Sequence, residues 1–310
     1  MSTLLKKHWL KFAAMIIIVG IFVKWTNLSA SLSSLCSIDL VFFGMALILV
    51  LGFNLLKGIR FCMLLQASGI RLSFLHTFLV SEMTLIVGRI TPAKLGEGIK
   101  VMYIDAKKTD LSFCFVLERL ADFISLFFFA LFSLSLFSQF MPSVVLFGAG
   151  IIAVIAAMMY SDRLLKFFFK QNVLEEKWFI NGLKKLSISD WATYISLSIC
   201  IRLGVLVLPV LIGRSLGIHL DIITTFALYS VAILVGNLSA LPGGFGAREG
   251  TYSYLLSQAA AISMPLAGLA ATLITLSDLL IETALGITAY LLLKLFSARS
   301  GDKISQKSKK

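Results

Sequence analysis

Long apolar runs, separated by short polar segments, dominate the sequence, and several are long enough to cross a membrane as helices. They lack the regular alternation of apolar and polar positions that is typical of a membrane β-barrel. We predict spans near residues 12–23, 38–56, 111–137, 141–160, 191–212 and 265–293. Because lysines precede the first of these, a cleaved signal peptide is the alternative to a retained first helix.

Two further apolar runs, 74–87 and 222–235, lead into related motifs, ITPAKLGEGIK at 90–100 and LSALPGGFGAREG at 238–250. Proline cannot donate a backbone hydrogen bond and glycine leaves helical geometry easily, so both motifs predict a broken helix. The residues that favour the breaks are Pro92, Gly96, Pro242, Gly243, Gly244 and Gly246. A break at membrane depth must be covered by protein or face a watery cavity. For 238–250, an ordinary external loop is the alternative.

Charge patterning predicts the topology. The net charge is +12, and most of the 28 Lys and Arg residues fall in segments that one orientation places in the cytoplasm. In that orientation both termini and residues 161–190 are cytoplasmic, whereas Lys24 and Arg214 are outside. The segment 161–190 mixes basic and aromatic residues, so it is either a cytoplasmic loop or a helix in the headgroup layer. This distribution indicates a membrane protein and no nucleic-acid partner.

The predicted topology contains an inverted repeat. Residues 38–137 and 191–293 each hold a span, a broken segment and a second span, in opposite orientations. Such a repeat is typical of secondary transporters. We therefore predict an all-α polytopic membrane protein with about six transmembrane helices and two re-entrant broken helices. Residues 1–295 form one membrane domain, and 296–310 form a basic cytoplasmic tail.

Carboxylates occur in pairs within two of the predicted spans. Glu118 and Asp122 are four residues apart, as are Asp278 and Glu282, so each pair lies on one helix face. Charged groups are costly in lipid, so these faces should meet in the protein interior. They either bind a headgroup or protons, or form ion pairs that only hold helices together. The candidate substrate-binding residues are Glu97, Glu118, Arg119, Asp122, Arg202, Arg248, Glu249, Asp278 and Glu282.

Known catalytic motifs give no support for an enzyme. The sequence has no Walker A, HExxH or GxSxG motif, and its four cysteines show no CxxC spacing. We therefore expect no enzymatic activity, no metal and no cofactor.

The stretches TPAKLGEG at 91–98, ERLADF at 118–123 and LPGGFGAREG at 241–250 resemble the lysylphosphatidylglycerol synthase transmembrane-region family, also called the flippase-like domain family. Ala93 and Glu97 depart from it, since glycine and aspartate are usual there. The resemblance covers about 10–295. The matching positions are Pro92, Gly96, Glu97, Glu118, Arg119, Asp122, Pro242, Gly243, Gly244, Gly246 and Glu249.

The resemblance implies movement of a lipid across the cytoplasmic membrane of a prokaryote. It also implies a stand-alone member, without the soluble aminoacyl transferase domain of the bifunctional proteins. Membrane lipid, and protons that drive the cycle, are the expected partners. One alternative is a non-transporting membrane protein that stabilises or presents lipid to a glycosyltransferase or another lipid enzyme. Another is a membrane-embedded transferase, for which the sequence offers no nucleophile or base beside the charges.

Overall fold

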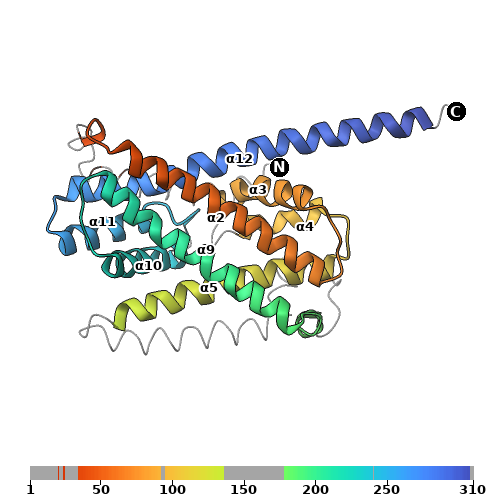
Figure 1. The fold of residues 1–310 in the computed structure, drawn as a ribbon, viewed down its shortest axis with the longest axis horizontal. Helices are drawn as coiled ribbons and strands as arrows, with labels where there is room; N and C mark the ends of the chain where they lie inside the picture. The colour runs from red at the N-terminus through yellow and green to blue at the C-terminus, as the bar shows by residue number, and fades with distance from the viewer. Residues whose placement is uncertain are drawn as a thin grey trace.

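The computed structural model describes residues 34–91, 95–135, 178–239 and 241–307, together with Gly20 and Lys24. Within these ranges the chain forms helices joined by turns, and no strand is present (Figure 1). Three helical stretches, Leu40–Ala67, Ile188–Ser215 and Met264–Leu295, are long and apolar enough to cross a membrane. The protein is therefore an all-α polytopic membrane protein, as predicted.

The bundle consists of long helices and several shorter ones. The elements are α2 (Leu40–Ala67), α3 (Phe74–Ile90), the 3-10 helix η2 (Leu95–Ile99), α4 (Lys100–Tyr103), α5 (Lys108–Ser135), α8 (Trp178–Leu183), α9 (Ile188–Ser215), α10 (Ile222–Leu238), α11 (Ala247–Ala260) and α12 (Met264–Lys307). The long helices α2, α5 and α9 each have 28 residues, about 42 Å at 1.5 Å per residue. That exceeds the hydrocarbon core of about 30 Å.

Polar caps define where several helices begin. The Asp39 carboxylate accepts a hydrogen bond from Val41 N at 2.8 Å at the start of α2. Ser187 and Asp190 form a capping box at the start of α9. Ser73 caps α3 and Asp221 caps α10 in the same way. These side chains satisfy backbone N–H groups that have no partner within the helix, so each apolar run begins at a defined residue.

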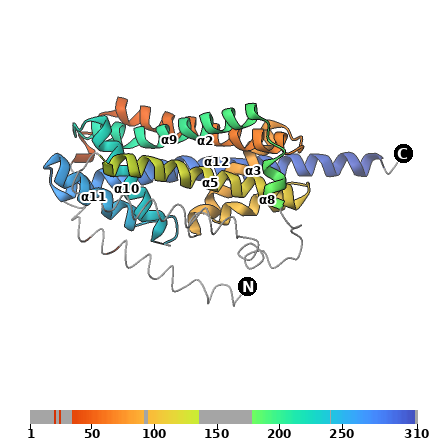
Figure 2. The ribbon, with the colours of Figure 1, turned by 90° about the horizontal axis from the view of Figure 1, so that it is seen from below.

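The two halves of the chain match in the lengths of two helices and exchange their broken helices. The helices before each break, α3 and α10, both have 17 residues, and the long helices α2 and α9 pack against each other. The first-half helix α3 packs against α12, whereas the second-half helix α10 packs against α5 (Figure 2). This exchange of α3 and α10 between the halves is the packing expected of an inverted repeat.

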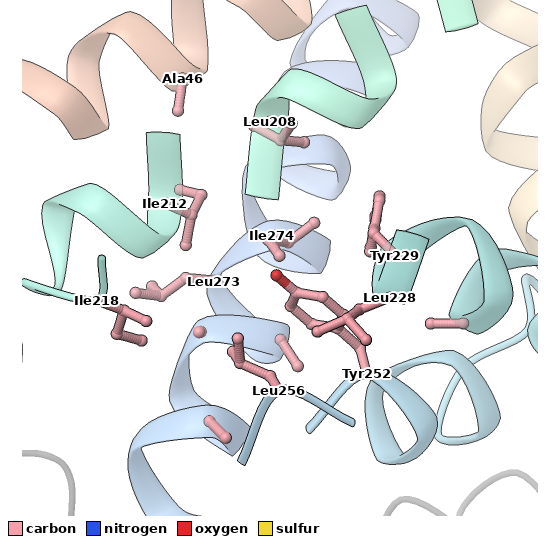
Figure 3. Packing of buried hydrophobic residues seen from close by; sticks show 14 of the residues in the cluster. Ala46, Leu208, Ile212, Ile218, Leu228, Tyr229, Tyr252, Leu256, Leu273 and Ile274 are labelled. Carbon is pink, nitrogen blue, oxygen red and sulfur yellow. The ribbon is translucent and has the colours of Figure 1, made fainter. Parts of the chain in front are cut away.

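Apolar clusters occupy both ends of the bundle. One joins α2, α9, α10, α11 and α12, and Figure 3 shows Tyr252 pointing into it beside Tyr229, with ring centroids 5.2 Å apart. The other joins the later part of α2 to the earlier parts of α5 and α9. Between them, α2 carries Lys57 and Arg60, and α9 carries Ser198 and Arg202. A polar layer therefore crosses the bundle between two apolar ends.

One predicted boundary was wrong. The second span was expected to end near residue 56, but α2 continues to Ala67 and Arg60, in its second half, is buried. Arg89 and Lys100 are buried too. The burial of these basic residues was not predicted, because most of their carboxylate partners are remote in sequence. The last helix also continues through the predicted tail to Lys307.

Some predictions concern residues outside the described ranges. The predicted span 141–160 and most of the segment 161–190 lie there, as does Pro92. The predicted span 12–23 also lies outside them, except for Gly20.

Candidate functional site

The second break is a turn that only glycine can make. After α10 ends at Leu238, the chain turns through Gly243, Gly244 and Gly246, whose φ angles are +60°, +71° and +83°. A Cβ on Gly244 would lie 2.9 Å from the backbone of Gly236. Both the left-handed φ and the close backbone contact exclude a larger side chain there. The motif at 238–250 is thus a break packed against its own helix.

Glu249 stabilises the restart after this break. Its Oε2 accepts a hydrogen bond from Gly246 N at 2.6 Å, which caps the start of α11. Its Oε1 pairs with Arg248 Nη2 at 2.9 Å and accepts a hydrogen bond from Thr275 of α12. These partners engage both oxygens of Glu249, so the structure gives this predicted site residue a capping function.

The first break is stabilised by side-chain hydrogen bonds of a threonine, whereas the second turns through glycines. Thr91 Oγ1 accepts a hydrogen bond from Gly96 N at 2.7 Å, and its hydroxyl lies 3.1 Å from Gly88 O. The returning 3-10 helix η2 lies close to α3, since a Cβ on Gly88 would be 2.5 Å from Glu97 Cγ. The two breaks also meet each other, because a Cβ on Gly243 would lie 2.9 Å from Arg89 O.

Charged residues gather around the Glu118–Asp122 face of α5. Arg60 Nη2 lies 2.9 Å from Asp122 and 3.5 Å from Glu118, and buried Lys100 pairs with Glu118. Arg119 Nη2 lies 3.2 Å from Asp122 Oδ2. Two further contacts complete this α5 cluster: Arg119 with Glu97 at 3.1 Å, and Arg202 Nη2 with Asp122 O at 2.6 Å.

A second group, the α12 cluster, surrounds the other pair of carboxylates. Arg89 of α3 donates to Glu282 through Nε at 2.5 Å, and its Nη2 lies 3.4 Å from Asp278. Lys57 of α2 is a looser partner, with its Nζ 3.7 Å from Glu282. Among the described residues, Arg89 Nη1 and Asp278 Oδ1 are buried with no hydrogen-bond partner. Arg89 Nη1 therefore has an unused donor, and Asp278 Oδ1 an unused acceptor.

A cavity of about 100 Å³ joins the two clusters. Five basic side chains and three carboxylates line it, with aromatic and aliphatic groups between them. The charged lining residues are Lys57, Arg89, Arg119, Asp122, Arg202, Arg248, Asp278 and Glu282. Carboxylates from α5 and α12 therefore share one interior space although about 160 positions separate them in sequence. The excess of basic groups favours an anion, and the carboxylates leave room for a cationic group beside it.

Six of the nine predicted substrate-binding residues line this cavity. The other three, Glu97, Glu118 and Glu249, are buried among protein partners instead. Of the residues predicted to favour the breaks, Gly243 borders the cavity. Sequence reasoning missed Lys57, Arg60, Arg89 and Lys100. A signal for the first two was present, because the largely apolar run continues for about two helical turns after Arg60, to Ala67.

Comparison with known proteins matches nearly the whole chain to one family. The model of the lysylphosphatidylglycerol synthase TM region covers residues 9–286. The comparison with curated proteins gave no match. The match extends over both breaks, the α5 cluster and the α12 cluster, so the chain belongs to the lysylphosphatidylglycerol synthase TM-region family.

Proposed function

We propose that the protein moves an amphipathic lipid with a charged headgroup between the leaflets of a prokaryotic cytoplasmic membrane. Family membership supports a membrane role related to lipid. The observation that carries the proposal is the charged cavity where the two broken helices meet. Transporters with inverted repeats bind their substrates at this kind of junction.

The size and charge of the cavity suit a headgroup. At about 100 Å³ it is smaller than the pockets of about 300–1,000 Å³ that enclose whole small molecules. A headgroup would enter while its acyl chains stay in the bilayer. Arginines such as Arg89 and Arg202 would hold phosphate oxygens, because guanidinium groups donate in a planar fork. Asp122 and Asp278 would meet a cationic group on the same headgroup.

The exchanged packing supports alternating access. Each broken helix packs on the opposite half, α3 on α12 and α10 on α5, so rocking one half moves both breaks relative to the cavity. Such rocking would expose the cavity to one leaflet and then to the other. The proposal involves no bond-making chemistry, and we therefore propose a transporter and not an enzyme.

Reconstituted vesicles test the proposal. Symmetric vesicles would contain tail-labelled fluorescent phosphatidylglycerol or phosphatidylethanolamine, and dithionite would bleach the label in the outer leaflet only. When the protein is present, we expect dithionite to bleach a larger fraction of the labelled lipid than the outer leaflet holds, for at least one of the two lipids. Bleaching equal to protein-free vesicles for both lipids, with correctly folded protein, would favour the non-transporting partner.

The orientation follows from the same proposal, with both termini in the cytoplasm. Lys184 precedes α9 and His219 follows it, and both are exposed. Single cysteines at these two positions are tested in a background without Cys36, Cys62, Cys114 and Cys200. We expect an impermeant thiol reagent to label residue 219 from outside intact cells and residue 184 only after lysis. The reverse pattern would invert the topology.

A further inference from the structure

Glu82 has a buried carboxyl group that takes part in none of the contacts described above. It lies on α3, two turns before the break, and its side chain is 0% exposed. Among the described residues, neither Glu82 Oε1 nor Oε2 has a hydrogen-bond partner. An ionised carboxylate without a partner is very costly in an apolar interior, where such groups hold a proton instead.

The position of Glu82 connects the two charged clusters. Its helix packs against α2, η2, α4 and α12. Each of these elements carries one charged residue that acts on Glu82 electrostatically, and these residues are Lys57, Glu97, Lys100 and Glu282. Lys100 and Glu97 are engaged by Glu118 and Arg119 of the α5 cluster. Lys57 is the least constrained cation of the set.

Lys57 can change partners. Its Nζ donates a hydrogen bond to Asn54 Oδ1 at 2.9 Å and lies 3.7 Å from Glu282 Oε1. The other oxygen of Glu282 is already paired with Arg89. If Glu82 lost its proton, the new negative charge would attract Lys57 and repel Glu282. Lys57 also lines the cavity, so moving it toward Glu82 would take a positive charge from the cavity.

We propose that Glu82 is a proton-binding site and that its protonation keeps Lys57 at Glu282, in the cavity. The ligand is the proton, and the exchange forms or breaks one O–H bond on Glu82. Protonated Glu82 maintains the anion-binding charge of the cavity, and deprotonated Glu82 lowers it. The effect on lipid movement rests on the proposed function, whereas proton binding itself does not.

Infrared spectra of the purified protein test proton binding directly. We expect the wild type to lose a carboxylic-acid C=O band as pH rises, and the Glu82→Gln variant to lack that band. Thr77→Val is the matched control, because Thr77 is also on α3, 0% exposed and without a hydrogen-bond partner among the described residues, but does not titrate. Thr77→Val should keep the wild-type band. An identical pH series for wild type and Glu82→Gln overturns the proposal.

A second variant tests the switch without removing Glu82. In Lys57→Met the cation that would stabilise ionised Glu82 is absent, so the Glu82 band should persist to higher pH than in wild type. An unchanged band midpoint overturns the switch.

In the vesicle assay, the wild-type rate should fall about tenfold for each unit of rising pH above the pH at which Glu82 titrates, because the protonated fraction of Glu82 falls in the same way. Glu82→Gln should keep its low-pH rate throughout, and a wild-type pH profile in that variant contradicts the switch.

Transport and proton binding can fail separately. If no protein moves lipid but the Glu82 band titrates as expected, the proposed function is wrong and the proton site stands. If lipid moves and the band is absent from wild type at every pH, the proton site is wrong and the proposed function stands.

Discussion

Vesicles that carry the Arg89→Gln variant are expected to lose lipid translocation while the protein remains in the membrane. Arg89 holds Glu282 at 2.5 Å and Asp278 at 3.4 Å, and it lines the cavity from the helix that ends at the first break. Removing one partner of a buried, hydrogen-bonded charge pair at a binding surface costs about 2–5 kcal/mol. By the relation between affinity and free energy, the rate should fall at least about thirtyfold.

Two further variants separate function from packing. Arg71→Gln is the matched control, because Arg71 is exposed in the turn before α3 and should keep the wild-type rate. In the double variant Arg89→Gln/Glu282→Gln neither buried partner keeps its charge, so thermal stability should recover but translocation should not. Recovery of translocation in the double variant would mean that Arg89 and Glu282 only hold helices together. The bleaching rate and a melting curve are measured for each protein.

The largest loss of stability is expected from Lys100→Met. Lys100 is 0% exposed, its ammonium pairs with Glu118, and it lies 4.0 Å from the centre of the Phe61 ring. Without it, Glu118 keeps, among the described residues, the longer contacts to Arg60 at 3.5 Å and to Arg119 at 3.9 Å. Breaking a buried pair in this way costs about 3–5 kcal/mol of the free energy of unfolding. A lower melting temperature in detergent is the measured result.

An exposed lysine provides the comparison. Lys185 pairs with Asp110 at 2.7 Å, but its side chain is 42% exposed, and such pairs are worth about 0–1 kcal/mol. Lys185→Met should therefore melt close to the wild type. Adding Glu118→Gln to Lys100→Met removes the unpaired charge and should raise the melting temperature again. Equal melting temperatures for the Lys100 and Lys185 variants would show that the buried pair adds no stability.

Apolar length and helix-breaking residues were enough to predict most of the described architecture. The spans near 111–137 and 191–212 correspond to α5 and α9 within a few residues at each end. The break at 238–250 was predictable because glycine and proline act through their own backbone geometry, whatever surrounds them. The spacing of Asp278 and Glu282 likewise predicted a shared interior face, since helical geometry is local.

The partners of the charges were not predictable, because they depend on packing between distant segments. Arg60 reaches Asp122 across 62 positions, and Arg89 reaches Glu282 across 193. A basic residue near the end of an apolar run has the same local sequence whether it faces the cytoplasm or a buried carboxylate. Glu249 shows the converse case: its position after the break indicated a binding site, but its carboxylate is engaged in capping α11.

The exchange of broken helices between the two halves sets a condition on how the protein is made. Arg89 in α3 and Glu282 in α12 are 193 residues apart in the chain. At about 5–20 residues per second, a ribosome takes about 10–40 s to travel from one to the other. During that interval α3 lacks both the ion-pair partner of Arg89 and its packing against α12, although α2 is already present. The first half is thus inserted as an incomplete bundle, and α12 completes it once that helix has left the ribosome.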